Sequence, residues 1–299
     1  MYFRQLESFV EIAKQNSFTK AAEVLYLSQP TLTGHIQVLE GKLKTVLFNR
    51  SGKNVTLTEA GEILYNHAVN ILNLREQAFY CLSQYQGKLQ GELAIGASTV
   101  LQNYVLPRLL TDFNNEYPSV CFELKHFDSE AVIRAITFGS MDFGFIGTDV
   151  VNPDLEMCPI GSDRLILITA PDISLVGRGL SVDEILNMRI IIRELGSATR
   201  GLFQQALEKK GLGLEDLNVV AKIENPETIK KCVRAGLGVA ILSEQVVQED
   251  IKFGLLNGYT FDDLDLTRNF YFVSHKKRVL NPMARVFKEF TQDYFKEAP

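Results

Sequence analysis

Apolar residues recur at helical spacing through the first sixty residues of the chain. The pattern predicts a helix over 3–14, a short helix over 19–25, and a third helix that begins after Ser28. The third helix carries a narrow apolar stripe at steps of four, three and four, formed by Leu32, Ile36, Leu39 and Leu43. Ser28 is a suitable N-cap, and Pro30 falls in the first turn, where its missing N–H costs nothing.

The opposite face of this third helix bears small polar groups and no charge. It consists of Gln29, Pro30, Thr31, Thr33, Gly34, Gln37 and Gly41. Amide and hydroxyl groups suit the floor of a DNA major groove, because Gln pairs with adenine edges and Thr contacts bases or the thymine methyl. The pair of helices therefore predicts a helix-turn-helix, with an ordinary helical hairpin as the alternative. Because Gly34 and Gly41 each cost about 1 kcal/mol relative to Ala, we expect fraying after Leu39.

A two-stranded wing is expected after this helix. Residues 47–48 and 55–57 have the pattern of short strands and flank a polar turn at 51–54. Arg50 and Lys53 lie at its tip, where they would meet phosphates or the minor groove, although a solvated turn also explains Lys53. The residues predicted to contact DNA are Ser28, Gln29, Pro30, Thr31, Thr33, Gln37, Arg50 and Lys53.

One long helix is predicted from Glu62 to near Gly87. Its seam positions alternate steps of four and three, the period of a coiled coil, through Leu64, Ala68, Ile71, Arg75, Ala78, Leu82 and Tyr85. Arg75 interrupts the apolar seam and argues against a strict parallel zipper. A lone helix of this length has no core of its own, so we expect a second copy of the chain to cover the seam. A helix lying on the body of its own chain is the alternative.

Strand and helix patterns alternate beyond a polar hinge at 87–91. The predicted strands are 93–97, 120–124, 143–147, 165–169, 190–193, 219–223, 239–242 and 270–274. The predicted helices are 106–117, 129–138, 199–210, 227–235, 243–250 and 282–295. This alternation predicts α/β units with mainly parallel sheets and helices on both faces. Two such units, joined by crossings near 161–163 and 266–269, would leave a cleft between them.

Four corners of these units place hydroxyls or free backbone N–H groups at a helix start, which is a ready site for anions. Their residues are Ala97, Ser98, Thr99, Ser129, Ser197, Thr199, Arg200 and Asn225. Helix capping alone explains any single corner. Because ligands of open α/β sheets sit at the carboxyl ends of strands, all four are expected to face the cleft and bind a small anionic effector.

Several motifs of the first sixty residues occur together and in register. They are NSFTKAA at 16–22, LYLSQPTLT at 25–33, Ile36, LE at 39–40, LFNR at 47–50 and LTEAG at 57–61. In these motifs the chain resembles the LysR-type transcriptional regulators. The resemblance implies an N-terminal winged helix-turn-helix, a dimerising linker helix, and a two-subdomain α/β effector domain of periplasmic-binding-protein type. It implies a homodimer and favours a homotetramer.

Later motifs resemble one branch of that family. RE at 193–194 with GSATR at 196–200, and GAST at 96–99 with NYVLP at 103–107, are similar to the sulfur-assimilation and carbon-fixation regulators. That resemblance implies an inorganic oxyanion or a compact carboxylate or phosphate metabolite as effector. The chain departs from the branch at Val100 and Ala198, where a hydroxyl and a glycine are common.

The 299 residues divide into three expected parts. Residues 1–61 form the DNA-binding domain, 62–90 the linker helix and hinge, and 91–299 the effector domain. Within the effector domain, subdomain I comprises 91–162 and 268–299, and subdomain II comprises 163–267. Residues 1–61 carry a charge of +2 and the remainder −7, which agrees with −5 for the whole chain. So small a positive excess predicts that two or more copies bind double-stranded DNA together.

The sequence argues against several other classes of protein. It has no G-x-S-x-G, P-loop or G-x-G-x-x-G motif, and its four histidines share no motif, so we expect no enzyme. The four scattered cysteines lack metal or redox spacing, which predicts reduced thiols and no metal or cofactor. The charged amphipathic start and the lack of a long apolar run predict a cytoplasmic protein without membrane contact. The alternative function is a cytosolic solute-binding protein with an N-terminal oligomerisation module.

Overall fold

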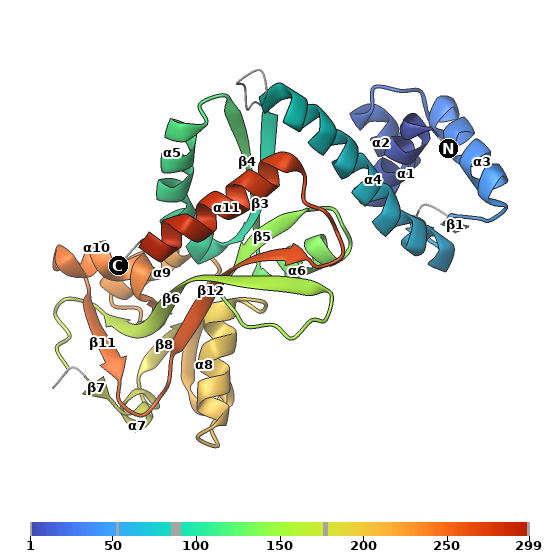
Figure 1. Ribbon diagram of the computed structural model, residues 1–299. Helices are drawn as coiled ribbons and strands as arrows, with labels where there is room; N and C mark the ends of the chain where they lie inside the picture. Colours follow the sequence, from blue (N-terminus) through green and yellow to red (C-terminus); the bar gives the residue numbers. More distant parts are fainter. Residues whose placement is uncertain (1, 52–53, 85–90, 176–178, 298–299) are drawn as a thin grey trace.

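The computed structural model describes residues 2–51, 54–84, 91–175 and 179–297. Figure 1 shows a small helical domain joined through α4 to a larger domain of sheets and helices. The first four helices are α1 (Phe3–Gln15), α2 (Phe18–Val24), α3 (Gln29–Leu43) and α4 (Glu59–Gln84). Tyr85, the end of the linker helix expected near Gly87, and most of the hinge lie outside the described residues.

Serine hydroxyls begin both helices of the helix-turn-helix. The Ser17 hydroxyl accepts a hydrogen bond from the Lys20 backbone N–H, and the Ser28 hydroxyl accepts one from the Thr31 N–H, each at 3.3 Å. Each bond satisfies a backbone donor that has no partner within its helix. The capping predicted for Ser28 is confirmed.

The apolar stripe of α3 is shorter than predicted. Leu32, Ile36 and Leu39 are fully buried, whereas Leu43 is 42% exposed. The expected fraying after Leu39 is also wrong, because α3 continues without a break to Leu43. Packing of the buried stripe against α1 and α2 outweighs the low helix propensity of the two glycines.

Gly41 offers a direct test of this explanation. A Cβ built on Gly41 meets no atom within 4 Å, so we expect Gly41→Ala to raise the free energy of unfolding by up to about 1 kcal/mol. Urea unfolding followed by circular dichroism measures the change. In the contrasting variant Gly61→Ala, the new Cβ would lie 2.2 Å from the Leu47 carbonyl oxygen, so that protein should lose stability. A Gly41→Ala protein less stable than the wild type would contradict the explanation.

The wing follows α3 as an antiparallel pair, β1 (Phe48–Ser51) and β2 (Asn54–Leu57). Phe48 is buried and its ring lies 5.3 Å from that of Phe9, centroid to centroid, so the wing is anchored in the core of the domain. Arg50 lies in β1, and Lys53 falls outside the described residues.

The N-terminal domain covers the first half of the seam predicted for the linker helix. Leu64, Ala68 and Ile71 of the predicted seam pack into the core of the N-terminal domain, so for them the alternative of a helix on its own body is correct. Arg75 forms ion pairs with Glu7 and Glu76. The large apolar side chains exposed in the described part of α4 are Ile63, Leu74, Phe79 and Leu82. The seam residues Ala78 and Leu82 are thus exposed, whereas the N-terminal domain covers the first half of the seam.

The larger domain contains all the strands and helices predicted for it, together with several that the sequence pattern missed. Its strands are β3 (Gly91–Ser98), β4 (Val120–Phe127), β5 (Phe143–Ile146), β6 (Leu155–Thr169), β7 (Gly179–Leu180), β8 (Arg189–Ile192), β9 (Asn218–Lys222), β10 (Val239–Ser243), β11 (Asn257–Phe261) and β12 (Thr267–His275). Its helices are a π-helix (Leu101–Val105), α5 (Leu106–Glu116), α6 (Ser129–Thr137), α7 (Val182–Ile185), α8 (Ala198–Glu208), a 3-10 turn (Leu214–Asp216), α9 (Pro226–Arg234), α10 (Glu244–Lys252) and α11 (Pro282–Glu297). The missed elements are β7, β11, α7, the π-helix, the 3-10 turn and the first half of β6.

The strands follow the order β4-β3-β5-β12-β6-β10-β8-β9, with β11 also beside β6. The outer sets β4-β3-β5 and β10-β8-β9 are parallel, as predicted, with helices packed against them. The middle is antiparallel, which corrects the expectation of mainly parallel sheets. β6 pairs with β12 over Leu155–Arg164 and with β10 over Leu165–Ile168, so it passes from one unit into the other. β12 runs beside β6 in the opposite direction, since it carries the chain back.

Within the described part of the chain, no helix is both long and apolar enough to cross a membrane. Nor do three or more His, Cys, Asp or Glu side chains gather there as ligands of a metal ion. The described cysteines Cys121, Cys158 and Cys232 are free thiols.

His275 is the last residue of β12, and the protonation of its ring makes the stability of the folded chain depend on pH. Its Nδ1 accepts a hydrogen bond from the Lys277 backbone N–H at 3.2 Å, which requires an unprotonated nitrogen. Burial lowers the pKa of His275 below its ordinary value of 6.5; the charges of Arg278 and Lys277 act in the same direction and Asp154 opposes them. A depressed pKa gives stability that is present above about pH 6.5 and is lost as the pH falls through the lower folded-state pKa.

We therefore expect the melting temperature to fall between about pH 7 and pH 5, and His275→Gln to reduce that fall. Thermal unfolding across this range measures both. Equal pH dependence in the wild type and His275→Gln would show that His275 does not contribute.

Candidate functional site

The outer face of α3 is uncharged and accessible. Gln29, Pro30, Thr31 and Gln37 are exposed, and Thr33 is half-buried. The Ser28 and Thr31 hydroxyls lie 2.7 Å apart and share a hydrogen bond, which holds both side chains at the start of the helix. The structure therefore groups the α3 residues predicted to contact DNA on one surface. Their contact with DNA remains a prediction.

A second candidate site lies where the two halves of the larger domain meet. It is a narrow cleft at the carboxyl ends of β3, β5 and β8, as expected for a ligand site in an α/β sheet. Of the predicted effector residues it contains Ser98, Thr99, Ser129, Ser197 and Thr199. The lining residues that the prediction omitted are Val100, Asp128, Gly147, Arg193, Glu194, Ala198, Arg268 and Phe270.

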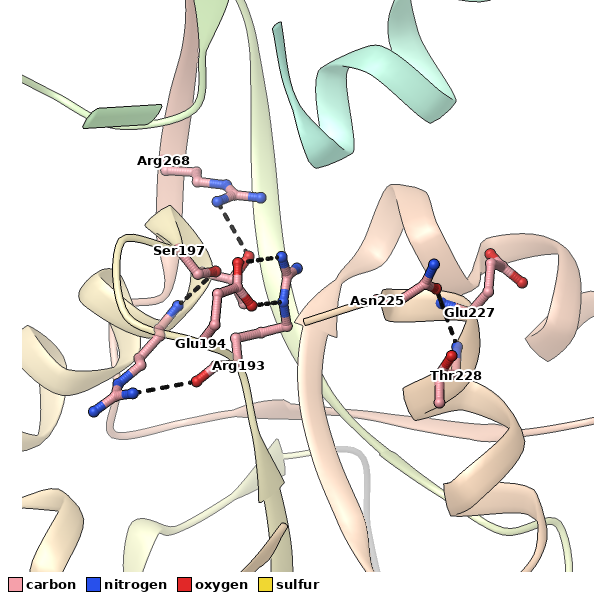
Figure 2. A network of polar contacts seen from close by, with 9 residues as sticks. Arg193, Glu194, Ser197, Asn225, Glu227, Thr228 and Arg268 are labelled. Atoms are coloured by element: carbon pink, nitrogen blue, oxygen red, sulfur yellow. Dashed lines mark hydrogen bonds and ion pairs between the residues drawn. The ribbon is translucent and has the colours of Figure 1, made fainter. Parts of the chain in front are cut away.

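Three predicted effector residues do not line this cleft. Ala97 is fully buried in the core behind it. The Arg200 guanidinium turns away and donates from Nη1 to the Arg193 carbonyl oxygen at 3.4 Å. Asn225 caps α9, since its Oδ1 accepts hydrogen bonds from the first backbone N–H groups of that helix. Figure 2 shows Asn225 apart from the group around Arg193, Ser197 and Arg268. The expectation that all four corners face one cleft is therefore wrong for the α9 corner.

Arg268 brings a positive charge to the crossing between the two halves. Its Nε and Nη2 donate to one carboxylate oxygen of Asp163, at 2.9 and 2.7 Å, and the Ser243 hydroxyl donates to the other at 2.8 Å. The remaining nitrogen, Nη1, makes only long contacts, with the Thr199 hydroxyl at 3.4 Å and the Gly147 carbonyl oxygen at 3.5 Å. Arg268 Nη1 is thus the nitrogen of this guanidinium that is least engaged, and it lies at the cleft.

The position of Arg268 was visible in the sequence, but its role was not. It is a single cation in the apolar strand RNFYF at 268–272, beside the predicted crossing. An arginine in a strand that runs through the centre of a sheet must find a buried partner. That signal could have marked Arg268 as a candidate.

Arg193 contributes a second cation, which already has a partner. Its side chain is 4% exposed, and it donates from Nε and Nη2 to the two carboxylate oxygens of Glu194 at 2.7 and 2.8 Å. Such a bidentate pair is rigid. With Arg268 bonded to Asp163, each cation at the cleft has a carboxylate beside it.

Ser129 provides the clearest polar group without a partner at the cleft. The residue is 3% exposed, and no hydrogen-bond partner for its hydroxyl occurs among residues 2–51, 54–84, 91–175 and 179–297. It opens α6, where Asp128 caps the helix by accepting a hydrogen bond from the Ala131 N–H at 2.6 Å. A buried hydroxyl without a partner costs free energy, so this group is well placed to bind a ligand atom.

The two halves also meet at one side of the cleft. The Tyr104 hydroxyl, in the π-helix of the first half, donates to the Glu227 carboxylate of α9. Burial, followed by this hydrogen bond, raises the pKa of Tyr104 above its ordinary value, so the hydroxyl keeps its proton. Lys230 completes the bridge by pairing with Glu227 at 2.8 Å and with Asp250 at 2.7 Å. This contact holds α9 against the first half.

Two family models together match nearly all of the chain. The model for the bacterial regulatory helix-turn-helix protein of the lysR family matches residues 3–62, and the LysR substrate binding domain matches residues 86–296. The chain belongs to the LysR family of transcriptional regulators. It is therefore a DNA-binding regulator with an effector-binding domain, and the alternative of a solute-binding protein with an oligomerisation module is set aside.

The relatives of this LysR-type regulator agree with the predicted branch. It is 34% identical over 286 residues to an HTH-type transcriptional regulator of Methanocaldococcus jannaschii, covering 95% of this chain and 96% of the relative. It is 30% identical over 291 residues to a probable RuBisCO transcriptional regulator of Cyanophora paradoxa, covering 95% and 89%. It is 31% identical over 252 residues to the HTH-type transcriptional regulator CysL of Bacillus subtilis, covering 84% and 83%.

Solved structures share the fold. Full-length OxyR from Pseudomonas aeruginosa aligns with a TM-score of 0.73 at 21% identity, covering 100% of this chain and 99% of OxyR. The regulatory domain of CcmR from Synechocystis, in complex with 2-PG, aligns with a TM-score of 0.64 at 23% identity. That alignment covers 70% of this chain and 100% of the CcmR domain. OxyR shares the whole arrangement of an N-terminal domain followed by a two-unit α/β domain. The CcmR structure shares the two-unit α/β domain.

Proposed function

We propose that this LysR-type regulator recognises DNA through the outer face of α3, from Ser28 to Gln37, with Arg50 and Lys53 of the wing on the flanking backbone. The uncharged, accessible amide and hydroxyl groups support this assignment, because they match the donors and acceptors of base edges. The divisions 1–61, 62–90 and 91–299, with subdomain limits at 162–163 and 267–268, belong to the same proposal.

Two copies of the chain are proposed to join through the exposed apolar face of α4. Ile63, Leu74 and Leu82 lie on that face, and each is more than half exposed. Paired linker helices would set the spacing of two α3 helices on a two-fold-related DNA site. A tetramer made of two such dimers follows from the family resemblance.

The effector is proposed to be a small anion held between the two halves of the cleft. The unpartnered hydroxyl of the buried Ser129 is the observation that carries the proposal. The backbone N–H groups at the starts of α6 and α8 and the loosely engaged Arg268 Nη1 supply further donors. The CcmR regulatory domain, which shares this fold, forms a complex with 2-PG, which supports a small ligand for this domain.

A thermal-shift screen tests this proposal. Sulfate, phosphate and small phosphorylated or carboxylate metabolites are compared with neutral analogues of equal size. A ligand at about one hundred times its dissociation constant stabilises the folded state by about 2.7 kcal/mol. We expect at least one anion to raise the melting temperature of the wild type but not of Ser129→Val, which blocks the hydroxyl position. Stabilisation by neutral compounds alone would contradict an anionic effector.

Effector binding is proposed to shift the assembly between two arrangements that space the α3 helices differently on DNA. The protein is proposed to act in the cytoplasm, without a metal, a cofactor or a catalytic reaction. Its relatives are transcriptional regulators, which supports this assignment.

A further inference from the structure

The linker helix is fastened to the effector domain of its own chain by polar contacts. The Tyr65 hydroxyl of α4 donates to the Gly139 carbonyl oxygen at 2.7 Å, and this bond is buried. One turn further along, Asn70 Nδ2 donates to the Lys277 carbonyl oxygen at 2.8 Å, and Asn70 Oδ1 accepts from the Val279 N–H at 2.8 Å. These contacts join residues about 70 and 210 positions apart in the sequence, so they fix two domains relative to each other.

Arg278 lies at the centre of this contact. It donates to the carbonyl oxygens of Ile136 and Thr137, which are the last carbonyls of α6 and have no partner within the helix. It also donates from Nε and Nη2 to Asn66 Oδ1 of α4, at 3.1 and 3.0 Å. One guanidinium therefore caps the carboxyl end of α6 and holds the linker helix.

The fit at this point is tight. A Cβ built on Gly139 would lie 2.4 Å from the Tyr65 ring, and Gly139 has a φ of +75°. The Arg278 guanidinium lies 5.5 Å from the centre of the same ring. Tyr65 thus fits against backbone on one side and a cation on the other, which sets the position of α4 closely.

The two ends of α6 lie at different sites. Its amino end carries Asp128 and Ser129 in the cleft, and its carboxyl end carries the carbonyls bound by Arg278. Nine residues of helix separate them by roughly 13 Å. Val132 and Ile136 are fully buried along one face, so the helix is packed as a unit. α6 is therefore a packed element that directly joins the cleft to the contact with the linker helix.

We propose that Tyr65, Asn66, Asn70, Gly139 and Arg278 form a latch that positions the DNA-binding domain on the effector domain. α6 connects the state of the cleft to this latch, so that an occupant of the cleft loosens or tightens the hold on the linker helix. The role of the occupant rests on the proposed function, whereas the mechanical connection does not.

The chemistry of the contact fits a part that opens. Apart from the Tyr65 ring it is made of hydrogen bonds, and such bonds contribute little net free energy because water replaces them when they break. A contact of this kind holds one arrangement without preventing another, unlike the apolar core beneath α4.

Hydrogen exchange followed by mass spectrometry on the full-length protein tests the connection from the cleft side. Asp128→Ala removes the cap of α6, and the readout is the Val279 segment across the latch. We expect exchange there to rise about five-fold, the effect of losing one N-cap. Asn225→Ala is the matched control, because it uncaps α9, a helix that packs on β6 and β10. It should raise exchange in α9 alone.

The reverse experiment removes latch contacts on α4 and measures exchange in the segment that directly follows α6. Asn70→Ala with Asn73→Ala removes the bonds to residues 277 and 279, including one from Asn73 Nδ2 to the Val279 carbonyl oxygen. We expect exchange of the amides at 138–141 to rise about ten-fold, since several hydrogen bonds are lost together. Asn115→Ala, at an exposed position of α5, is the control and should change nothing.

The connection through α6 would be overturned if Asp128→Ala left exchange at Val279 at the wild-type rate. It would also be overturned if Asn225→Ala raised exchange at Val279 as much as Asp128→Ala does. Unchanged exchange at 138–141 in the Asn70, Asn73 variant would overturn the latch itself. Neither readout uses DNA or a ligand. Failure of the wild-type protein to bind DNA would therefore contradict the proposed function, but it would not affect the outcome of these two exchange experiments.

Discussion

Arg268→Met is expected to destabilise the effector domain by about 3–5 kcal/mol. The substitution leaves the Asp163 carboxylate fully buried with the Ser243 hydroxyl and without its cation. An uncompensated buried charge is among the most costly changes that a single mutation makes. Urea or thermal unfolding of the full chain measures the loss.

The matched control removes an ion pair at the surface. Arg164 pairs with Glu244 at 2.9 Å, but both side chains are about half exposed, so Arg164→Met should cost no more than about 1 kcal/mol. The double variant Asp163→Asn with Arg268→Met should recover part of the loss, because no buried charge remains. Equal losses for Arg268→Met and Arg164→Met would show that the buried pair does not organise the crossing between the halves.

Gln37→Ala is expected to weaken binding to the cognate DNA site by about ten-fold or more, and Gln29→Ala by a similar factor. Each glutamine is exposed on α3, where a bidentate contact with a base contributes about 1–3 kcal/mol of discrimination. Both variants should bind unrelated DNA as the wild type does, because contacts with phosphates do not depend on sequence. Fluorescence anisotropy with cognate and scrambled duplexes measures both quantities.

Gln248→Ala, at an exposed position of α10, is the control for this pair of variants. It should leave both affinities unchanged. If Gln37→Ala and Gln29→Ala behaved like Gln248→Ala, the outer face of α3 would not be the surface that recognises DNA.

Much of the N-terminal domain followed from local rules. Ser28 is a cap, and Leu32, Ile36 and Leu39 are buried, because capping and helical periodicity act over a few residues. Leu43 is exposed because the core ends one turn earlier, which depends on the length of the packed helices. No local pattern contains that information.

The linker helix shows the limit of a periodic pattern. Its heptad spacing correctly marks an amphipathic helix, but two different surfaces compete for the apolar residues. Leu64, Ala68 and Ile71 pack on the N-terminal domain, and Leu74, Phe79 and Leu82 remain exposed further along. Tertiary packing decides which apolar residues meet which neighbour. The first half of the predicted seam is covered by the N-terminal domain, whereas Ala78 and Leu82 of its second half are exposed.

The sequence predicted the alternation of strands and helices in the effector domain, but it did not predict the antiparallel strands at the centre of the sheet. The first part of β6, LEMCPIG at 155–161, contains a proline and a glycine and has weak alternation, so it was missed. The irregularity at Phe270–Tyr271 in the pairing of β12 with β6 accommodates this segment. The direction of a crossing strand depends on the path of the whole chain.

The residues of the cleft were likewise predicted only where local sequence determines their position. Hydroxyls at helix starts correctly marked Ser98, Thr99, Ser129, Ser197 and Thr199 as neighbours. Asn225 has the same local chemistry but faces elsewhere, since a cap says where a helix begins and not where it points. Arg268 and Asp163 are 105 residues apart and meet only because β6 and β12 run side by side.

The most direct test of the account is an anisotropy titration of the full-length protein. The probes are a labelled duplex taken from upstream of its own gene and a scrambled duplex of equal composition, each over a series of salt concentrations. We predict that the upstream duplex binds about a thousand-fold or more tightly, and that the logarithm of its binding constant falls linearly with the logarithm of salt concentration. Equal affinity for both duplexes at every salt concentration would contradict a regulator that reads DNA through α3.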